Sequence, residues 1–299
     1  MGSPFDALKL DSKVNGVDYA GGNGKQEGGG IALRTKETIM QVATLGEQLR
    51  EWRTRRRMSQ MDLALDTEIS TRHLSFIETG RSKPSAQMLQ RIADCLDVPH
   101  RARNAMLLAA GYAPDYQERP LDSPEMAGMR AIVEHVLKGH EPYPALAVDR
   151  HWNMVAANSA VEILAGLAAP HLFEPPVNVL RIALHPEGLA PHIVNRDEWR
   201  AHILERLDHQ IDASADARLI ALREELAGYA VEAEEHHRSA ANGIAVPLIL
   251  DTPMGQIRFV STVTIFGTPV DITLSELAIE AFFPADAESA ALLQKLAAR

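Results

Sequence analysis

The spacing of hydrophobic and polar residues divides the chain into three parts. Residues 1–43 show no periodic apolar pattern and are rich in glycine and polar residues, which is typical of a disordered extension. From residue 44 apolar residues recur at helical spacing, and beyond residue 124 helical stretches are mixed with alternating stretches that indicate strands. The pattern predicts an all-α N-terminal domain and a C-terminal α+β domain.

Residues 44–114 are predicted to form five helices. The first begins with a capping box, in which the Thr44 hydroxyl and the Glu47 carboxylate bind free amides at the helix start. Leu63 and Leu65 are the expected apolar anchors of the second helix. The five helices begin near Leu45, Ser59, Ser70, Pro84 and Pro99, and the fifth ends at Gly111.

The third of these helices carries the candidate chemistry. At about 100° per residue, Leu74 and Ile77 share one side and can anchor the helix, while Arg72 and Phe76 lie on the opposite side. An outward ring beside an outward arginine suits the major groove of DNA, where arginine pairs with guanine and an apolar ring meets a thymine methyl. We interpret this helix as the recognition helix of a helix-turn-helix.

The charge distribution agrees with a DNA partner only on a local scale. The whole chain has a net charge of -10, which by itself argues against a nucleic-acid partner. Residues 45–114, however, carry eleven Lys/Arg against eight Asp/Glu, so this part has +3 and the remainder -13. Phosphate attraction depends on the face presented to the duplex. A solvated arginine-rich face is the competing interpretation. The local arginines are Arg50, Arg53, Arg55, Arg56 and Arg57.

These residues resemble the XRE family of repressor-type helix-turn-helix regulators, whose DNA-binding module has five helices. The resemblance covers about residues 45–99 and rests on several spaced positions that agree at once. Arg57 and Glu68 stand where family members commonly have glycine, and we expect a slightly altered turn at Glu68. The matching positions are Met58-Ser-Gln60, Leu63-Ala64, Ile69-Ser70, Leu74-Ser75, Ile77-Glu78-Thr-Gly80 and Pro84-Ser85.

The resemblance implies roles for individual side chains. It implies a structural ion pair between Arg53 and Glu78, which links the first and third helices. Gln60 would contact phosphate at the start of the second helix. The implied DNA-binding set is Gln60, Thr71, Arg72, Ser75 and Phe76 with the backbone-contacting Arg81 and Lys83.

Four stretches around and beyond the end of this module carry a second resemblance, namely Leu107–Pro114, Tyr143-Pro144, Val148–Asn153 and Leu184–Leu189. In these stretches the chain is similar to MmyB-like regulators, whose second domain is a PAS-like ligand-binding fold. The similarity implies a domain at residues 124–285 that binds a ligand and supports dimerisation, after a linker at residues 115–123 that is rich in Pro, Asp and Glu. Residues 286–299 are expected to form a helix or tail.

The order of elements in the second domain predicts one antiparallel sheet with helices packed on a face. Two strands are expected early, a block of helices follows, and three strands close the domain. Such a fold commonly encloses a pocket between sheet and helices. The predicted strands cover 145–148, 153–157, 246–250, 257–265 and 270–281, and the helices include one capped at Asn195 and another near 216–226.

The helix capped at Asn195 supplies the candidate ligand site. Trp199 and Ile203 lie on its apolar stripe, and His202 and Arg206 lie beside that stripe. A solvated polar edge is the simpler interpretation, because such edges are frequent on amphipathic helices. In the alternative, Arg206 anchors the acidic head of an apolar ligand through a charge-assisted hydrogen bond. The candidate ligand-binding residues are Met154, Trp199, His202, Ile203 and Arg206.

No pattern indicates catalysis, a cofactor or a metal site. G-x-S-x-G, H-E-x-x-H and P-loop motifs do not occur in the sequence. The adjacent His236 and His237 would diverge on a helix, and His185 and His192 lack a Cys or carboxylate spacing that defines a zinc site. Cys95 is expected in the apolar core. We therefore expect no enzyme, no cofactor and no metal.

Together these patterns predict a ligand-controlled, DNA-binding transcription regulator that acts as a homodimeric repressor on a double-stranded operator. The ligand implied by the MmyB-like resemblance is small and apolar, similar to a fatty acid. The sequence has neither an apolar run of ~18 residues nor a signal core, which predicts a cytoplasmic protein without a membrane partner. A DNA-bound protein-interaction module without a small-molecule ligand and an enzyme fused to a helix-turn-helix are the alternatives.

Overall fold

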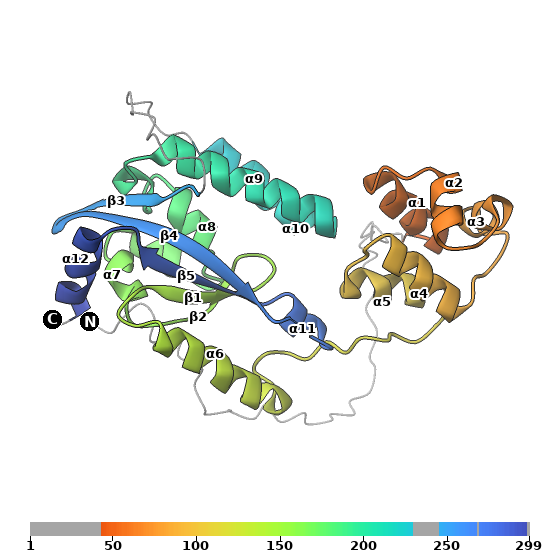
Figure 1. The fold of residues 1–299 in the computed structure, drawn as a ribbon, viewed down its shortest axis with the longest axis horizontal. Helices are drawn as coiled ribbons and strands as arrows, with labels where there is room; N and C mark the ends of the chain where they lie inside the picture. The colour runs from red at the N-terminus through yellow and green to blue at the C-terminus, as the bar shows by residue number, and fades with distance from the viewer. Residues whose placement is uncertain (1–42, 230–244, 268, 298–299) are drawn as a thin grey trace, which may run out of the picture.

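The computed structural model describes residues 43–229, 245–267 and 269–297. Residues 1–42, for which disorder was predicted, lie outside the described residues. The pair His236-His237 lies outside them as well. Figure 1 shows a group of helices from the first part of the chain beside a larger body, in which helices flank a sheet. Within the described part, no helix has both the length and the apolar character needed to cross a membrane.

The five predicted N-terminal helices are confirmed. Each of the first four begins at a Ser or Thr whose hydroxyl accepts a hydrogen bond from the amide three residues later, so local sequence fixes these helix starts. The helices are α1 (Leu45–Arg55), α2 (Gln60–Asp66), α3 (Thr71–Glu78), α4 (Ala86–Cys95) and α5 (His100–Ala109).

A continuous apolar core holds these helices together, and Leu74 and Ile77 of α3 are fully buried in it as predicted. The prediction that Leu65 anchors α2 is wrong, because Leu65 is 76% exposed. Two residues along a helix rotate a side chain by roughly 200°, so Leu65 cannot share the buried face of Leu63. Gly46 permits α1 to approach α3 closely, since a Cβ there would lie 2.2 Å from the Glu78 carbonyl oxygen.

The two turns at which glycine is replaced keep ordinary helix-end geometry. Arg57 and Glu68 both adopt positive φ, 56° and 54°. After α2, the Ile69 amide donates to the Ala64 carbonyl and the Glu68 amide to the Leu65 carbonyl, the bonds of a left-handed helix end. The expected alteration of this turn is therefore wrong: Glu68 itself takes the left-handed conformation.

The C-terminal part is an α+β domain, as predicted, with one antiparallel sheet. The prediction of a strand over 270–281 is wrong for residues 270–277, which contain a short helix that Asp271 caps. The elements are η2 (Pro124–Met126), α6 (Ala127–Gly139), β1 (Ala145–Val148), β2 (Met154–Ala157), α7 (Val161–Ala165), η3 (Pro170–Phe173), α8 (Val179–Leu184), η4 (Ala190–His192), α9 (Arg196–Ser214), α10 (Ala217–Gly228), β3 (Leu248–Thr252), β4 (Gly255–Ile265), α11 (Ile272–Ser275), β5 (Ala278–Pro284) and α12 (Ala287–Ala297).

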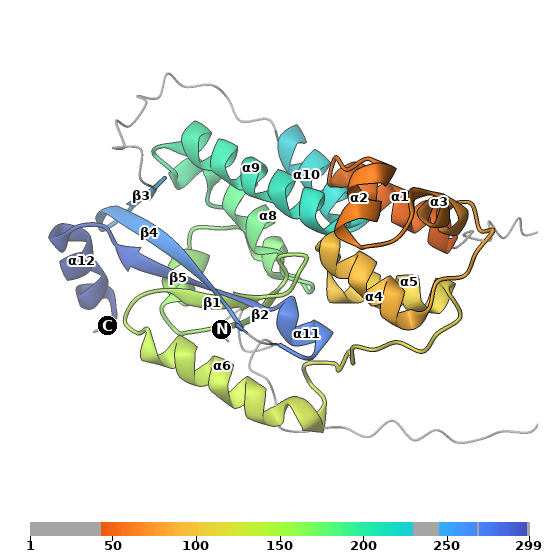
Figure 2. The same ribbon diagram turned by 45° about the vertical axis from the view of Figure 1, so that its right-hand side comes forward.

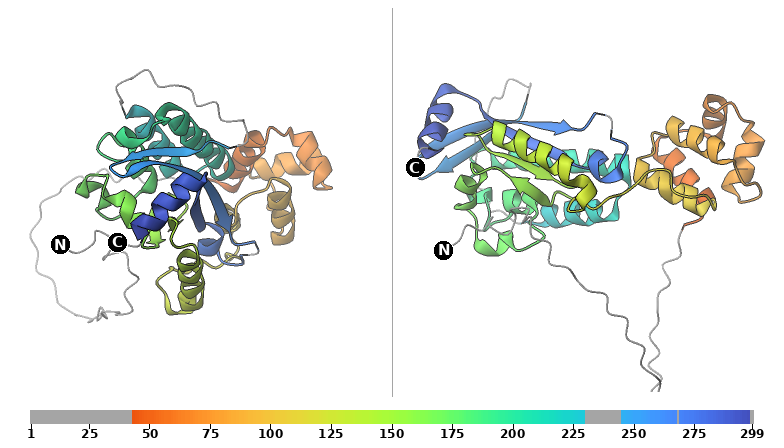
Figure 3. Two further views of the ribbon diagram at one scale, coloured as in Figure 1. Left: turned by 60° about the vertical axis from the view of Figure 1, so that its left-hand side comes forward. Right: turned by 90° about the horizontal axis from the view of Figure 1, so that it is seen from below.

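The sheet has the order β2-β1-β5-β4-β3, so the early strands join the late ones through the pairing of β1 with β5. All four pairings are antiparallel. α9 and α10 lie on one side of the sheet and α6 lies on the opposite side (Figures 1 and 3). Both faces are therefore covered, and all four residues of β1 are buried.

The start of α9 is held by the sheet instead of by a side-chain cap. Asn195 does not cap the helix with its side chain, contrary to expectation. Its oxygen accepts from the Ile249 amide at 3.2 Å, and its amide group donates to the Pro247 carbonyl at 2.8 Å. These two bonds fasten the start of α9 to the edge strand β3 and the residue before it. They also satisfy the polar groups of Asn195, which are buried.

The far end of α9 reaches the N-terminal helices. Arg55 of α1 donates to the Ile211 carbonyl at 3.1 Å, and Arg56 donates to the Asp212 carbonyl at 3.3 Å. Figure 2 shows the C-terminal end of α9 beside α1. A second connection joins Arg101 of α5 to Glu276 after α11, with two bonds of 2.9 Å.

Candidate DNA-binding surface and ligand pocket

A buried carboxylate positions the helices of the candidate DNA-binding surface. Both oxygens of Glu78 on α3 accept from Arg53 of α1, at 2.7 and 3.1 Å, and the Glu78 side chain is fully buried. The implied ion pair between α1 and α3 is thus confirmed. Burial raises the pKa of Glu78, but hydrogen bonds from Arg53 and Gln60 and the charges of Arg53 and Arg50 outweigh it, so the pKa is lowered overall.

Gln60 belongs to the same network. Its side-chain amide donates to Glu78 at 2.7 Å from the first residue of α2. The network therefore ties the start of α2 to the end of α3. The phosphate contact of Gln60 stays a prediction.

The outward face of α3 gathers two arginines around one ring. The guanidinium carbons of Arg72 and Arg81 lie 5.3 and 6.0 Å from the centroid of the Phe76 ring. Both arginines are exposed, whereas Phe76 is partly buried. Guanidinium groups on an aromatic face are held by cation–π attraction, which restrains them without using their hydrogen-bond donors. No hydrogen bond is found for either guanidinium group among the described residues, and the contacts of both arginines with DNA stay predictions.

The other predicted DNA-binding residues also lie at this surface. Thr71 is exposed at the first position of α3, and Ser75 is partly buried one turn later. Lys83 is exposed after the turn, with its ammonium nitrogen 4.6 Å from the centroid of Tyr112. Thr71, Arg72, Arg81 and Lys83 are thus accessible to solvent, and their contacts with DNA stay predictions.

A cavity of about 90 Å³ lies between the sheet and the helices of the C-terminal domain. Its wall is mainly aliphatic and aromatic, and it draws on β1, β2, β3, β5, η3 and α7 to α9. Four of the five predicted ligand-binding residues are part of the wall, namely Met154, Trp199, Ile203 and Arg206. Other wall residues include Leu146, Leu164, Phe173, Ile182, Leu189, Leu248 and Phe282.

Arg206 and Glu280 form the polar part of this wall. Arg206 of α9 donates to Glu280 of β5 at 2.9 Å, and its guanidinium carbon lies 4.2 Å from the centroid of Trp152. The Glu280 side chain is 7% exposed. Arg206 is therefore already paired, so an acidic ligand must compete with Glu280 for it.

Trp199 and His202 differ in their relation to the cavity. The buried Nε1 of Trp199 has no hydrogen-bond partner among the described residues, and Trp199 as a residue is part of the wall. His202 does not belong to the wall; its ring lies 5.5 Å from that of Trp199. Burial and the nearby charge of Arg206 lower the pKa of His202, although Glu205 and Glu280 act in the opposite direction.

Glu280 was not among the predicted site residues, although the sequence contains a signal for it. It stands between apolar neighbours in the run Ala278–Phe283, where an inward carboxylate is costly unless it is paired. The partner could not be identified from spacing, because Arg206 is 74 residues away in the chain.

Comparison with protein families assigns both domains. A helix-turn-helix domain matches residues 44–106, and the MmyB-like transcription regulator ligand binding domain matches residues 129–296. The chain belongs to the MmyB-like transcription regulators. A comparison with curated proteins finds no match to this chain.

This MmyB-like regulator therefore combines a DNA-binding part with a ligand-binding part, and both are domains of a transcription regulator. It is a DNA-binding regulator that responds to a ligand. The position of the cavity inside the matched ligand-binding domain makes it the candidate ligand site.

Proposed function

We propose that this MmyB-like regulator is a homodimeric repressor that is controlled by a small apolar, fatty-acid-like ligand in the C-terminal cavity. Residues 44–114 would bind the operator, and residues 124–285 would bind the ligand and hold the two copies together. One recognition helix covers only a few base pairs, so a second half-site about one helical turn away supplies affinity that one copy lacks.

The chemistry of the cavity supports the proposed ligand class. Its wall is apolar except for the Arg206–Glu280 pair and Trp199, whose Nε1 has no partner in the described part of the chain. An apolar chain would bury its surface against the wall, and a polar head would accept from Arg206 or Trp199. An acidic head takes the place of the Glu280 carboxylate at Arg206, whereas an alcohol head leaves the ion pair intact.

Because the cavity is small, binding of an apolar chain requires its wall to change shape. An apolar cavity of ~150 Å³ accommodates benzene. The present cavity of about 90 Å³ is smaller, so a longer chain enters only when the wall moves apart. A ligand that binds the expanded arrangement better than the compact one shifts the protein toward the expanded one.

The proposed control of DNA binding by the ligand rests on one observation: α9 runs from the cavity to the N-terminal helices. Arg206 lies at the cavity, and the Ile211 and Asp212 carbonyls of the same helix accept from Arg55 and Arg56 of α1. α1 in turn holds α3 through Arg53 and Glu78. Expansion of the wall at Arg206 is thus transmitted by one rigid helix to the module that carries the recognition helix.

Operator binding in the presence of candidate ligands tests this proposal. Fluorescence anisotropy is measured on DNA flanking the protein's own gene with lauric acid, lauryl alcohol or no addition. We expect operator affinity to fall on addition of an apolar-chain ligand, with random DNA as the control. An unchanged affinity, together with an empty protein by native mass spectrometry, would contradict ligand control and favour a protein-interaction domain.

A further inference from the structure

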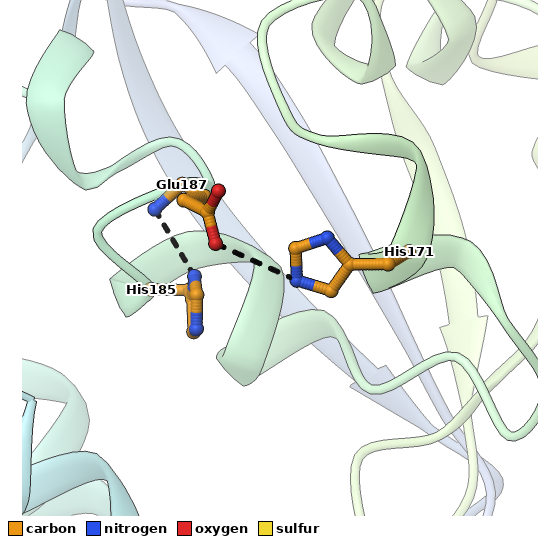
Figure 4. Close-up of side chains that lie close together, drawn as sticks. All are labelled: His171, His185 and Glu187. Atoms are coloured by element: carbon orange, nitrogen blue, oxygen red, sulfur yellow. Dashed lines mark hydrogen bonds and ion pairs between the residues drawn. The ribbon is translucent and has the colours of Figure 1, made fainter.

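Two histidines and a glutamate from separate segments converge on the surface of the C-terminal domain (Figure 4). His171 belongs to η3, His185 follows α8, and Glu187 lies in the next turn. One potential metal-ligand atom from each residue lies within 4.8 Å of the other two. His171 Nε2 is 3.9 Å from a Glu187 carboxylate oxygen, and the two histidine ring centroids are 5.7 Å apart.

The backbone beneath this cluster is fixed. The Ala169 amide donates to the Glu187 carbonyl at 2.8 Å, which joins the segment before His171 to the turn of Glu187. Gly188 is required at this turn, because a Cβ there would lie 2.1 Å from the Ile182 carbonyl oxygen. The three side chains therefore project from a prearranged base, which reduces the entropy lost on binding a metal ion.

The three potential metal ligands are of types that zinc binds. Two imidazoles and one carboxylate, with water in the fourth position, are common for Zn²⁺ sites that keep an open position. Tetrahedral coordination at bond lengths of about 2.0–2.1 Å places ligand atoms roughly 3.4 Å apart. Since the side chains of His171 and Glu187 are 49% and 66% exposed, rotation about their side-chain bonds can close the remaining distance without disturbing the core.

The present contacts within the cluster are compatible with metal capture. His185 Nδ1 accepts from the Glu187 amide at 3.0 Å, so the lone pair of this nitrogen lies on the side of the ring that faces the turn. A metal ion at Nδ1 replaces this single bond. The His171–Glu187 contact is exposed and contributes little by itself, so it opposes the rearrangement only weakly.

We propose that His171, His185 and Glu187 bind a divalent transition-metal ion of the zinc type. The ion joins η3 to the turn after α8. Both segments also form the cavity wall, through Phe173 on η3 and Leu189 beyond the turn. The bound ion therefore braces this part of the wall from the outside, independently of what the cavity binds.

Isothermal titration of the full-length protein with Zn²⁺ tests the site. The wild type is expected to bind one ion in a defined transition, and His171→Ala and Glu187→Gln are expected to weaken that binding by roughly 10- to 100-fold or more. His135→Ala is the matched control, because His135 is exposed on α6 across the sheet. A His236→Ala/His237→Ala variant is the second control. Both controls are expected to bind Zn²⁺ as the wild type does.

Two further measurements distinguish a real site from adventitious surface binding. Co²⁺ is expected to give the visible absorption of tetrahedral coordination in the wild type and not in His171→Ala. Zn²⁺ is also expected to slow hydrogen exchange in peptides that span 169–173 and 185–189. Wild-type affinity in both His171→Ala and Glu187→Gln, or loss of binding in the His236/His237 control instead, would overturn the assignment.

Discussion

Arg206 and Glu280 meet at the cavity wall with 2.9 Å between guanidinium nitrogen and carboxylate oxygen. They come from α9 and β5, so the pair fastens the long helix to the centre of the sheet. Arg206 therefore has two possible partners, the Glu280 carboxylate and the head group of an acidic ligand. Competition between these partners determines how strongly the cavity prefers acids to neutral molecules.

Glu280→Gln is therefore expected to strengthen binding of an acidic apolar ligand. The amide keeps the shape of the side chain but leaves Arg206 without a paired charge, and a charge-assisted bond contributes ~1.5–3 kcal/mol. We expect lauric acid to bind about tenfold tighter or better, as measured by calorimetry. Lauryl alcohol serves as the control and is expected to change much less. Equal changes for acid and alcohol would show that Arg206 does not select the head group.

The buried Glu78 gives the DNA-binding module a pH-dependent stability. Its pKa is lowered in the folded state, so its contribution is fully present above the ordinary pKa of about 4.5 and is lost as the pH falls through the folded value. The stability difference between wild type and Glu78→Gln is expected to be largest near neutral pH and to shrink below pH ~4.5. Denaturant unfolding at a series of pH values, followed by hydrogen exchange of peptides from residues 45–109, measures it. A difference that stays constant down to pH ~3 would contradict the assignment.

Replacing Glu68 with glycine is expected to stabilise the module. Glu68 has a φ of 54°, and a left-handed residue with a side chain costs ~1–2 kcal/mol, whereas glycine adopts this conformation freely. Among the described residues, the one ion pair found for its carboxylate is an exposed contact with Arg91 at 3.8 Å. Glu68→Gly is expected to raise stability by about 1 kcal/mol in thermal unfolding, and the control Glu68→Ala is expected not to. A gain of the same size in both variants would point to charge instead of backbone conformation.

The sequence predicts the N-terminal module well because its information is local. Hydroxyl caps at Thr44, Ser59, Ser70 and Ser85 and the helical spacing of apolar residues lie within one or two turns of the structure that they specify. The prediction that Leu65 is an anchor is wrong because an apolar residue is buried only where its angle around the helix faces the core. Its 76% exposure follows from its position alone.

The sites are less predictable because their parts come from distant segments. Arg206 was recognised from its helix, but its partner Glu280 lies on the central strand β5 and is specified by the sheet order. His185 and Glu187 are two residues apart, whereas His171 comes from a separate segment that the Ala169 amide joins to the Glu187 carbonyl. Spacing along the chain contains neither relationship.

Substitutions at Arg72 and Lys83 are expected to distinguish a residue that reads bases from one that contacts the DNA backbone. Arg72→Ala is expected to cost ~1–3 kcal/mol on the cognate site and to relax base preference, because its guanidinium projects from the outward face of α3. Lys83→Ala is expected to weaken all DNA sequences alike and to reduce the salt dependence. Anisotropy on specific and random duplexes at several salt concentrations measures both. Equal losses on the two duplexes for Arg72→Ala would exclude base reading.

The contact between α1 and α9 offers the most direct test of how ligand and DNA sites communicate. Arg55 donates to the Ile211 carbonyl at 3.1 Å, and the only other bond found for its side chain in the described residues joins Glu51 on its own helix. Arg55→Met removes the contact with α9 and leaves the outward face of α3 intact.

Operator affinity without ligand is expected to change little in Arg55→Met, whereas the ligand-induced change is expected to shrink by about two- to tenfold, the worth of one ~0.5–1.5 kcal/mol hydrogen bond. Arg91→Met is the control, since Arg91 is 49% exposed on α4 and its ion pair in the described part of the chain is with Glu68, not with α9. An undiminished ligand effect in Arg55→Met would mean that this contact does not transmit the signal. Since Arg56 also bonds the end of α9, combining both substitutions should reduce the ligand effect further than either alone.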